Sequence, residues 1–254
     1  NSAVFSTIDA LLLRPLPGTR DPGELVQVYR SWPGMQFGSN SVPHFLDVRD
    51  RAGDVFTGTA AWGFQTLSLS VDGQPSRVMG QAVSANYFDV LGVRAALGRT
   101  FVPAEDSGRR AHPVVVLSHT AWTRSFGADP NVVGRKVVLN GESYQVVGVT
   151  PPGFKGGLPL AAPVLWAPLT QTDHLEPGSN RWERRGNNNL NVVARIRPGV
   201  TLAQVEQRMT AIVSELREIY PDEYKDSGIY LVPQSEAGIH PMFRGAQLGL
   251  SAVV

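Results

Sequence analysis

The sequence predicts an α+β domain in which an outer strand–helix–strand unit is split by an inserted segment of β-hairpins and short helices. Three observations predict this class. The order strand, helix, strand occurs in the first third of the chain and returns in the last third. Apolar residues alternate around Asp-Gly and again around Asn-Gly, which predicts two hairpins. Finally, 26 glycines and 19 prolines among 254 residues divide the chain into many short elements.

The first third begins the outer unit. Residues 24–31 (ELVQVYRS) are predicted as a strand. Residues 41–53 (SVPHFLDVRDRAG) follow as a short helix that Ser41 caps, with Phe45 and Val48 on one face.

A hairpin over residues 66–84 completes this unit. Leu67, Leu69 and Val71 alternate before Asp72-Gly73, a pair typical of two-residue hairpin turns. Residues 85–92 (ANYFDVLG) then predict a helical turn that Gly92 ends.

The middle of the chain predicts the inserted segment. Residues 113–127 read as a strand and then a helix, and residues 163–169 as a further strand. Between them, residues 134–154 form the second hairpin, in which Val138, Tyr144 and Val146 alternate around Asn140-Gly141. Asn-Gly tolerates positive φ at both corners of a type I′ turn, so a two-residue turn is expected here.

The last third repeats the outer pattern. Residues 190–200 predict a strand, residues 201–220 the clearest helix of the chain, and residues 228–234 another strand. Thr201 and Gln204 have the spacing of a capping box. One apolar stripe follows on this helix: Val205, Met209, Ile212, Val213, Leu216 and Ile219.

Composition excludes several classes of protein. The 23 basic and 22 acidic residues give a net charge of +1, whereas nucleic-acid binders concentrate a surplus of Lys and Arg, so no nucleic-acid partner is expected. The chain has no cysteine, which excludes disulfides, thiolate metal sites and cysteine nucleophiles. Apolar residues make up 42% of the chain, enough to fill a core.

Both chain ends are apolar and predict helix ends. Residues 4–12 carry apolar residues at helical spacing and stop at Arg14-Pro15, while the run after Arg244 continues to Val254. Neither run reaches the roughly 20 apolar residues of a membrane span, and the start lacks the pattern of a signal peptide. Two truncated helices are the expected interpretation.

Candidate catalytic residues do not form a convincing site in the sequence. Ser118 precedes His119, but adjacent helical residues point in different directions, so Ser118 is interpreted as a helix N-cap. Asp173, His174 and Glu176 could begin a metal site, yet no paired-histidine spacing accompanies them, and a solvated loop is expected.

Two further segments suggest ligands. Residues 127–136 faintly suggest a phosphate loop, but Lys136 precedes Val137 where Ser or Thr would bind magnesium, which excludes that interpretation. Residues 181–191 (RWERRGNNNLN) combine Trp182, several arginines and Asn187 to Asn189, and predict an exposed, adaptable loop. No catalytic, cofactor-binding or metal-binding residue is therefore assigned, and no cofactor is expected.

Four long phrases identify a family. They are VFSTIDALLLRPLP, VSANYFDVLGVRAALGRTF, VVVLSHTAWTRSFGADPNVVGRKVVLNGESYQVVGVTPPGF and ARIRPGVTLAQVEQRMTAI. In this order they resemble consecutive segments of the periplasmic core domain of MacB-type ABC-transporter permeases. The similarity points to the duplicated-permease branch of that family, which is related to FtsX-like permeases.

This resemblance implies a domain inserted between two membrane helices of a permease, outside the cytoplasmic membrane. Residues 1–17 would end the first membrane helix and residues 241–254 would start the second. Residues 18–94 and 186–240 would form the two halves of a split porter-like βαβ subdomain, and residues 95–185 a mixed β-hairpin/α subdomain inserted within it. The resemblance also explains why residues 134–154 end in Pro-Pro-Gly-Phe, because this phrase closes a fixed structural module in the family.

The resemblance also implies a function and partners. A cytoplasmic ATPase hydrolyses ATP, and helix motion moves the periplasmic domain to drive export or release, so this chain is expected to be no enzyme. The implied partners are that ATPase, a periplasmic adaptor, a second permease half or second copy, and the membrane through the flanking helices. Leu11, Leu12 and Leu13 with Arg14-Pro15 would carry motion into the fold, and the helix over residues 201–220 would hold the porter half rigid.

Two other classes of protein remain open from sequence. A secreted or periplasmic small-ligand-binding protein would use residues 181–191 as the lip of its site. A hydrolase would be built on Ser118 or His174.

Overall fold

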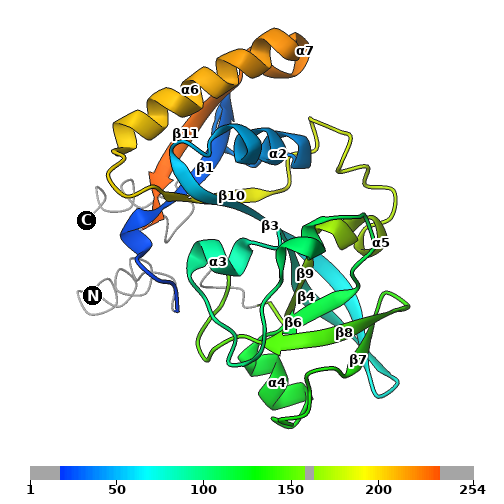
Figure 1. Cartoon of the computed structure of the whole chain (residues 1–254). Helices are drawn as coiled ribbons and strands as arrows, with labels where there is room; N and C mark the ends of the chain where they lie inside the picture. Colours follow the sequence, from blue (N-terminus) through cyan, green and yellow to red (C-terminus); the bar gives the residue numbers. More distant parts are fainter. Residues whose placement is uncertain (1–17, 158–162, 235–254) are drawn as a thin grey trace, which may run out of the picture.

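The computed structural model describes residues 18–157 and 163–234 (Figure 1). Its strands are β1 (Leu25–Trp32), β2 (Met35–Gly38), β3 (Phe56–Val71), β4 (Gln74–Val83), β5 (Leu97–Gly98), β6 (Val114–Leu117), β7 (Lys136–Leu139), β8 (Glu142–Val149), β9 (Leu165–Pro168), β10 (Asn191–Ile196) and β11 (Gly228–Pro233). Its helices are α2 (Val42–Arg51), α3 (Tyr87–Leu91), α4 (His119–Ser125), α5 (Thr172–Leu175), α6 (Leu202–Ile219) and α7 (Pro221–Tyr224), with the 3-10 turns η1 (Pro22–Glu24), η2 (Pro103–Asp106) and η3 (Leu169–Gln171). The predicted hairpins and the helices over residues 41–53 and 201–220 are confirmed.

All of these strands belong to one sheet. Its order is β11-β1-β10-β3-β4-β9-β6-β8-β5, with β2 beside β1 and β7 beside β3 and β8. The fold is therefore a sheet-dominated mixture of strands and helices, and no helix in the described part of the chain has the length and apolar character that a membrane crossing requires. The predicted helix ends at residues 1–17 and 241–254 lie outside the described residues.

The upper part of the molecule in Figure 1 packs α2 and α6 on one face of β11, β1 and β10. On α6, Thr201 Oγ1 accepts a hydrogen bond from the Gln204 backbone N–H, and the Gln204 side chain accepts one from the Thr201 N–H, so the predicted capping box is present. Five of the six stripe residues are buried. Ile219 is the exception: this residue is 53% exposed and is the last residue of α6.

The hairpin of β3 and β4 joins the two parts of the sheet. β3 has 16 residues, pairs with β10 near its start and with β7 near its end, and begins ten residues before the predicted strand. Its turn residues Asp72 (φ 51°) and Gly73 (φ 78°) have the positive φ that a two-residue hairpin turn requires. The sequence missed the first part of β3 because Gly58, Ala60, Ala61 and Gly63 are weak strand formers.

The lower part contains the second predicted hairpin, β7 and β8. Asn140 (φ 47°) and Gly141 (φ 91°) form the expected turn. Val138, which belongs to the predicted alternation around this turn, does not share a face with Tyr144: it pairs with Ser143 and is 39% exposed. Val137 and Leu139 are buried in its place.

The Pro-Pro-Gly-Phe phrase after β8 ends in an aromatic core. Phe154 lies against Trp166 (5.4 Å between ring centroids), and both rings lie against Phe88 of α3. Ala60 of β3 belongs to this core, whereas its neighbour Ala61 belongs to the core under α2 and α6. Because adjacent strand residues point to opposite faces, the two cores lie on opposite sides of the sheet.

Candidate functional site

Ser118 and His119 do not form a catalytic pair. Ser118 is buried and caps α4, where its Oγ accepts a hydrogen bond from the Ala121 N–H (3.1 Å). The His119 ring lies edge-on to Trp122. The predicted N-cap role of Ser118 is confirmed, and the arrangement that a hydrolase would need is not formed by this pair.

Asp173, His174 and Glu176 are not a solvated loop as expected. His174 is buried in α5, and its Nδ1 lies 2.7 Å from the Tyr144 hydroxyl oxygen. Asp173 pairs with Arg109, and Glu176 pairs with Arg181. The sequence missed this arrangement because Tyr144 and Arg109 lie far from α5 along the chain. In residues 18–157 and 163–234, no group of three or more His, Cys, Asp or Glu side chains is placed to hold a metal ion.

Residues 127–136, which faintly suggest a phosphate loop in the sequence, form part of the scaffold. The Gly134 N–H donates to the Val146 carbonyl (2.8 Å), and Trp122 Nε1 donates to the Asp129 carbonyl. The segment therefore links α4 to the β7–β8 hairpin.

The connection from α5 to β10, residues 176–190, corrects the prediction of an exposed loop. Arg181 is buried, and Trp182 Nε1 donates to Thr172 Oγ1 (3.2 Å). Arg185 bonds Asp47 of α2 (2.5 Å between Nη1 and Oδ2), and its guanidinium lies 3.6 Å from the centre of the Tyr220 ring. This connection therefore ties the lower part of the molecule to the upper part.

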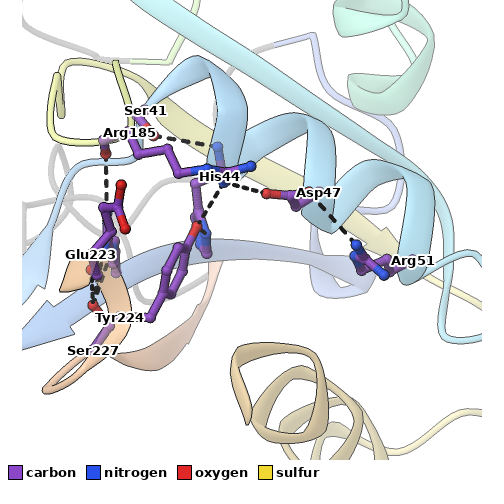
Figure 2. Close-up of polar contacts among 9 residues, drawn as sticks. Ser41, His44, Asp47, Arg51, Arg185, Glu223, Tyr224 and Ser227 are labelled. Atoms are coloured by element: carbon purple, nitrogen blue, oxygen red, sulfur yellow. Dashed lines mark hydrogen bonds and ion pairs between the residues drawn. The ribbon is translucent and has the colours of Figure 1, made fainter. Parts of the chain in front are cut away.

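Arg185 belongs to a polar cluster that we define as Arg30, His44, Asp47, Arg185 and Tyr224. Figure 2 labels the last four of these residues. His44 and Asp47 come from α2, Arg30 from β1 and Tyr224 from α7. Ser41 caps α2 by accepting from the His44 N–H, which fixes the position of this histidine. The sequence predicted the cap but not the cluster, because its members come from distant parts of the chain; His44 and Tyr224 alone are 180 residues apart.

Hydrogen bonds connect the members of this cluster. Arg185 Nη1 donates to the Tyr224 hydroxyl oxygen (3.3 Å), and the same oxygen lies within hydrogen-bond distance of His44 Nδ1 (2.8 Å). Arg30 lies over the Tyr224 ring and bonds Ser227 Oγ and the backbone oxygens of Arg185 and Glu223. Burial, together with the charges of Arg30 and Arg185, lowers the pKa of His44 to about 3, and burial raises the pKa of Tyr224. His44 is therefore neutral at ordinary pH.

A groove of about 460 Å³ lies beside the cluster. Trp32, Pro33, Asp222, Glu223, Lys225 and Asp226 are among its lining residues. Ser227 is the only hydroxyl among the lining residues, and it accepts from Arg30 and donates to the Glu223 carbonyl (3.2 Å). This serine is therefore held in the scaffold, with its hydroxyl proton on a backbone carbonyl and not on a base.

The groove lies at one end of the pair of strands β1 and β11. The start of β1 and the finish of β11 lie at the opposite end of this pair. Ser31 pairs with Gly228 near the groove, whereas Val26 pairs with Pro233 at the opposite end. In Figure 1 the blue start of the described chain lies beside the tip of the β11 arrow. A cavity of about 320 Å³ at this end is lined by residues that include Leu25, Val200, Leu202 and Pro233.

Comparisons with known proteins agree with one family. The model of the MacB-like periplasmic core domain matches residues 2–212. The macrolide export ATP-binding/permease protein MacB of Aggregatibacter actinomycetemcomitans is 30% identical over 99 residues, which cover 39% of this chain and 15% of that protein. MacB of Burkholderia thailandensis is 26% identical over 131 residues, 52% of this chain and 19% of that protein. The chain thus spans less than a fifth of the length of these relatives.

Solved structures share the fold. The periplasmic region of MacB from Actinobacillus actinomycetemcomitans superposes with a TM-score of 0.61 at 14% identity, covering 96% of this chain and 99% of that one. The extracellular domain of the noncanonic ABC-type transporter YknZ from Gram-positive bacteria has a TM-score of 0.56 at 15% identity, covering 81% and 99%.

Proposed function

This chain belongs to the family of MacB-like periplasmic core domains, and we propose that it couples the ATP-driven motion of membrane helices to work outside the cytoplasmic membrane. As a domain of this family it lies on the periplasmic or extracellular face of that membrane. The work would be export or release of a substrate, and the domain would take part mechanically.

The observation that carries this proposal is the pairing of Val26 with Pro233. β1 starts and β11 finishes at the same end of the sheet, so the first and the last strand of the described chain begin and end side by side. A domain inserted between two membrane helices needs this arrangement, because both helices enter the same face of the bilayer. A secreted ligand-binding protein has no such requirement.

A non-catalytic role fits the polar residues described above. Ser118 caps a helix, His174 bonds Tyr144, and Arg185 holds Asp47 and the Tyr220 ring. Each of these three groups is thus engaged in a contact that holds the fold together. ATP chemistry is assigned to a cytoplasmic ATPase.

We assign the finer architecture by the same family logic. Residues 18–94 and 186–240 would form the split porter-like subdomain, and residues 95–185 the inserted subdomain, with residues 1–17 and 241–254 in the membrane helices. The core under α2 and α6 supports this division, since most of its residues come from the two outer segments. The core around the β7–β8 hairpin draws mainly on residues 115–175 and on the hairpin of β3 and β4.

The proposed partners are a cytoplasmic ATPase, a second permease half or second copy, a periplasmic adaptor and the membrane. The two MacB relatives are named ATP-binding/permease proteins, which supports the ATPase partner.

Hydrogen–deuterium exchange tests the coupling in the full-length permease with its ATPase, reconstituted in lipid. Nucleotide binds on the opposite side of the membrane, so any change in this domain requires transmitted motion. We expect ATP with vanadate to change the exchange of amides in residues 18–24 and in β10. Exchange that is identical with and without nucleotide throughout the described residues would reject the proposal.

A further inference from the structure

Arg195 is a buried arginine in the middle of the sheet. It lies on β10 opposite Gly58 of β3, and its side chain is 8% exposed. The register of the two strands shifts immediately after it, between Arg195 and Ile196. Such β-bulges re-aim a side chain, and here the guanidinium is directed toward the start of the described chain.

The guanidinium makes four hydrogen bonds to two other segments. Nη2 donates to the Arg20 carbonyl (2.7 Å), and Nη1 donates to the Glu24 carboxylate (2.9 Å) and more weakly to the Asp21 carbonyl (3.4 Å). Nε donates to the Val90 carbonyl of α3 (2.9 Å). We call residues 18–24 the junction, because they connect the body of the fold with residues 1–17.

The junction also contacts α3 directly. The Arg20 N–H donates to the Leu91 carbonyl (3.0 Å), so Arg20 and Arg195 together satisfy two of the last carbonyls of this helix. Gly92, which ends α3, has φ 72°, and a Cβ atom there would lie 2.5 Å from Arg20 Cβ. Glycine thus permits both the turn and the close approach.

The elements joined by this contact reach two cores, because β10 contributes Val193 to the aromatic core of α3 and its other face to the core under α2 and α6. Val192 and Ala194 of β10 pack under α2 and α6, whereas Phe88, Val90 and Leu91 of α3 pack with Phe154 and Trp166. A displacement of the junction would therefore act on both cores through the side chain of Arg195.

We propose that Arg195 is the positioning residue that passes junction movement to β10 and α3 together. This inference rests on the proposed coupling function. A lysine would carry the charge but not the planar fork of donors, so it would retain a bond to Glu24 and lose the simultaneous bonds to Arg20 and Val90.

Pulsed EPR distances and hydrogen exchange test this role in the full-length permease with its ATPase. Spin labels are placed through Gly23→Cys in the junction and Asp89→Cys on the exposed side of α3. These 254 residues contain no cysteine, and any cysteine elsewhere in the permease or its ATPase is replaced first. In the otherwise native chain we expect one narrow distance in both nucleotide states. In Arg195→Ala we expect the distribution of distances between the two labels to widen at least twofold. We also expect the change in hydrogen exchange caused by nucleotide to be confined to residues 18–24.

Arg197→Ala is the matched control. Arg197 lies two residues further on, is exposed, and bonds the Gly53 carbonyl rather than the junction. It should behave as the native chain in both measurements. Arg195→Lys is the second test variant, for the case that loss of the buried side chain prevents folding, and it should widen the distance distribution as well.

Two results separate the inference from the function. In the first, hydrogen exchange in the native chain responds to nucleotide, and Arg195→Ala or Arg195→Lys keeps both the native spin-label distances and the native exchange response in α3 and β10. This result overturns the role of Arg195 and leaves the coupling function standing. If the native chain itself shows no response, both fail.

Discussion

Ile212 lies at the centre of the stripe that fixes α6 to the sheet. It is fully buried, in contact with the core that includes Phe45 and Val192. Ile212→Asp would place an unpaired carboxylate in that core and should lower the free energy of unfolding by several kcal/mol. Chemical denaturation of the domain measures this loss.

Ile219 provides the matched control on the same helix. Its side chain is 53% exposed, so Ile219→Asp should leave the unfolding midpoint close to that of the native chain. Equal losses for the two substitutions would contradict the packing of α6 described above.

His44 should make the domain sensitive to acid. Its pKa is lowered to about 3 in the folded state by burial and by Arg30 and Arg185, and the ordinary value is 6.5. Between these values the unfolded chain binds a proton that the folded chain does not, so stability is intact above pH 6.5 and falls as the pH decreases toward 3. The slope for one group is about 1.4 kcal/mol per pH unit.

His44→Asn keeps an acceptor for the Tyr224 hydroxyl and removes the titration. Denaturation at pH 7, 6, 5 and 4 should therefore give a flatter profile for this variant than for the native chain. Parallel profiles would show that another group causes the acid loss.

Local side-chain roles could be predicted from sequence, and long-range ones could not. Ser41, Ser118 and Thr201 bond backbone groups three residues away, so spacing alone identified them as caps. Arg195 bonds groups that are 105 to 175 residues away along the chain, and nothing near Arg195 in the sequence indicates these partners.

Among the elements, the β7–β8 hairpin depends most on its turn. Gly141 has φ 91°, a conformation that costs an L-residue about 1 to 2 kcal/mol. Gly141→Ala should therefore destabilise the domain by that order in thermal or chemical unfolding.

Gly186→Ala is the control for a glycine without such a requirement. A Cβ at Gly186 meets no atom within 4 Å, and its φ lies outside the left-handed region. This substitution should be close to neutral. A similar loss for both variants would indicate that the hairpin turn is not the cause.

Elements with a strong local pattern were predictable, and elements defined by their surroundings were not. The alternation around Asp72-Gly73 and Asn140-Gly141 determined both turns. The first part of β3 has small residues and becomes a strand through pairing with β10. Residues 176–190 have the composition of an exposed loop, but contacts with Asp47, Thr172 and Tyr220 hold them against the fold.

At the scale of the whole molecule, β3 connects all the cores. Phe56 and Ala61 belong to the core under α2 and α6, Ala60 and Trp62 to the aromatic core, and Leu67 and Leu69 to the core of the second hairpin. Because one strand contributes to each core, we expect the domain to unfold in a single cooperative transition. Differential scanning calorimetry with and without a chelator should give the same single transition, since we expect the fold to form without a metal. Separate transitions, or a loss of cooperativity on adding the chelator, would contradict this expectation.

The family could be recognised from four phrases in order, whereas the arrangement of the chain in space required the structure. In particular, the pairing of β1 with both β10 and β11 brings residue 26 beside residue 233. No periodicity in the sequence predicts that pairing.

The most direct test of the central claim is a pair of labels at Ser2 and Ser251 of the full-length permease in a lipid bilayer. If both ends continue into neighbouring membrane helices, the labels should lie at the same leaflet and within roughly 25 Å of each other, given a helix spacing of about 8 to 10 Å and short stubs of 1.5 Å per residue. Pulsed EPR gives the separation, and relaxation enhancement by lipid-soluble and water-soluble agents gives the depth of each label. Labels at opposite poles of the domain, or one label at the membrane and the other far from it, would contradict the account.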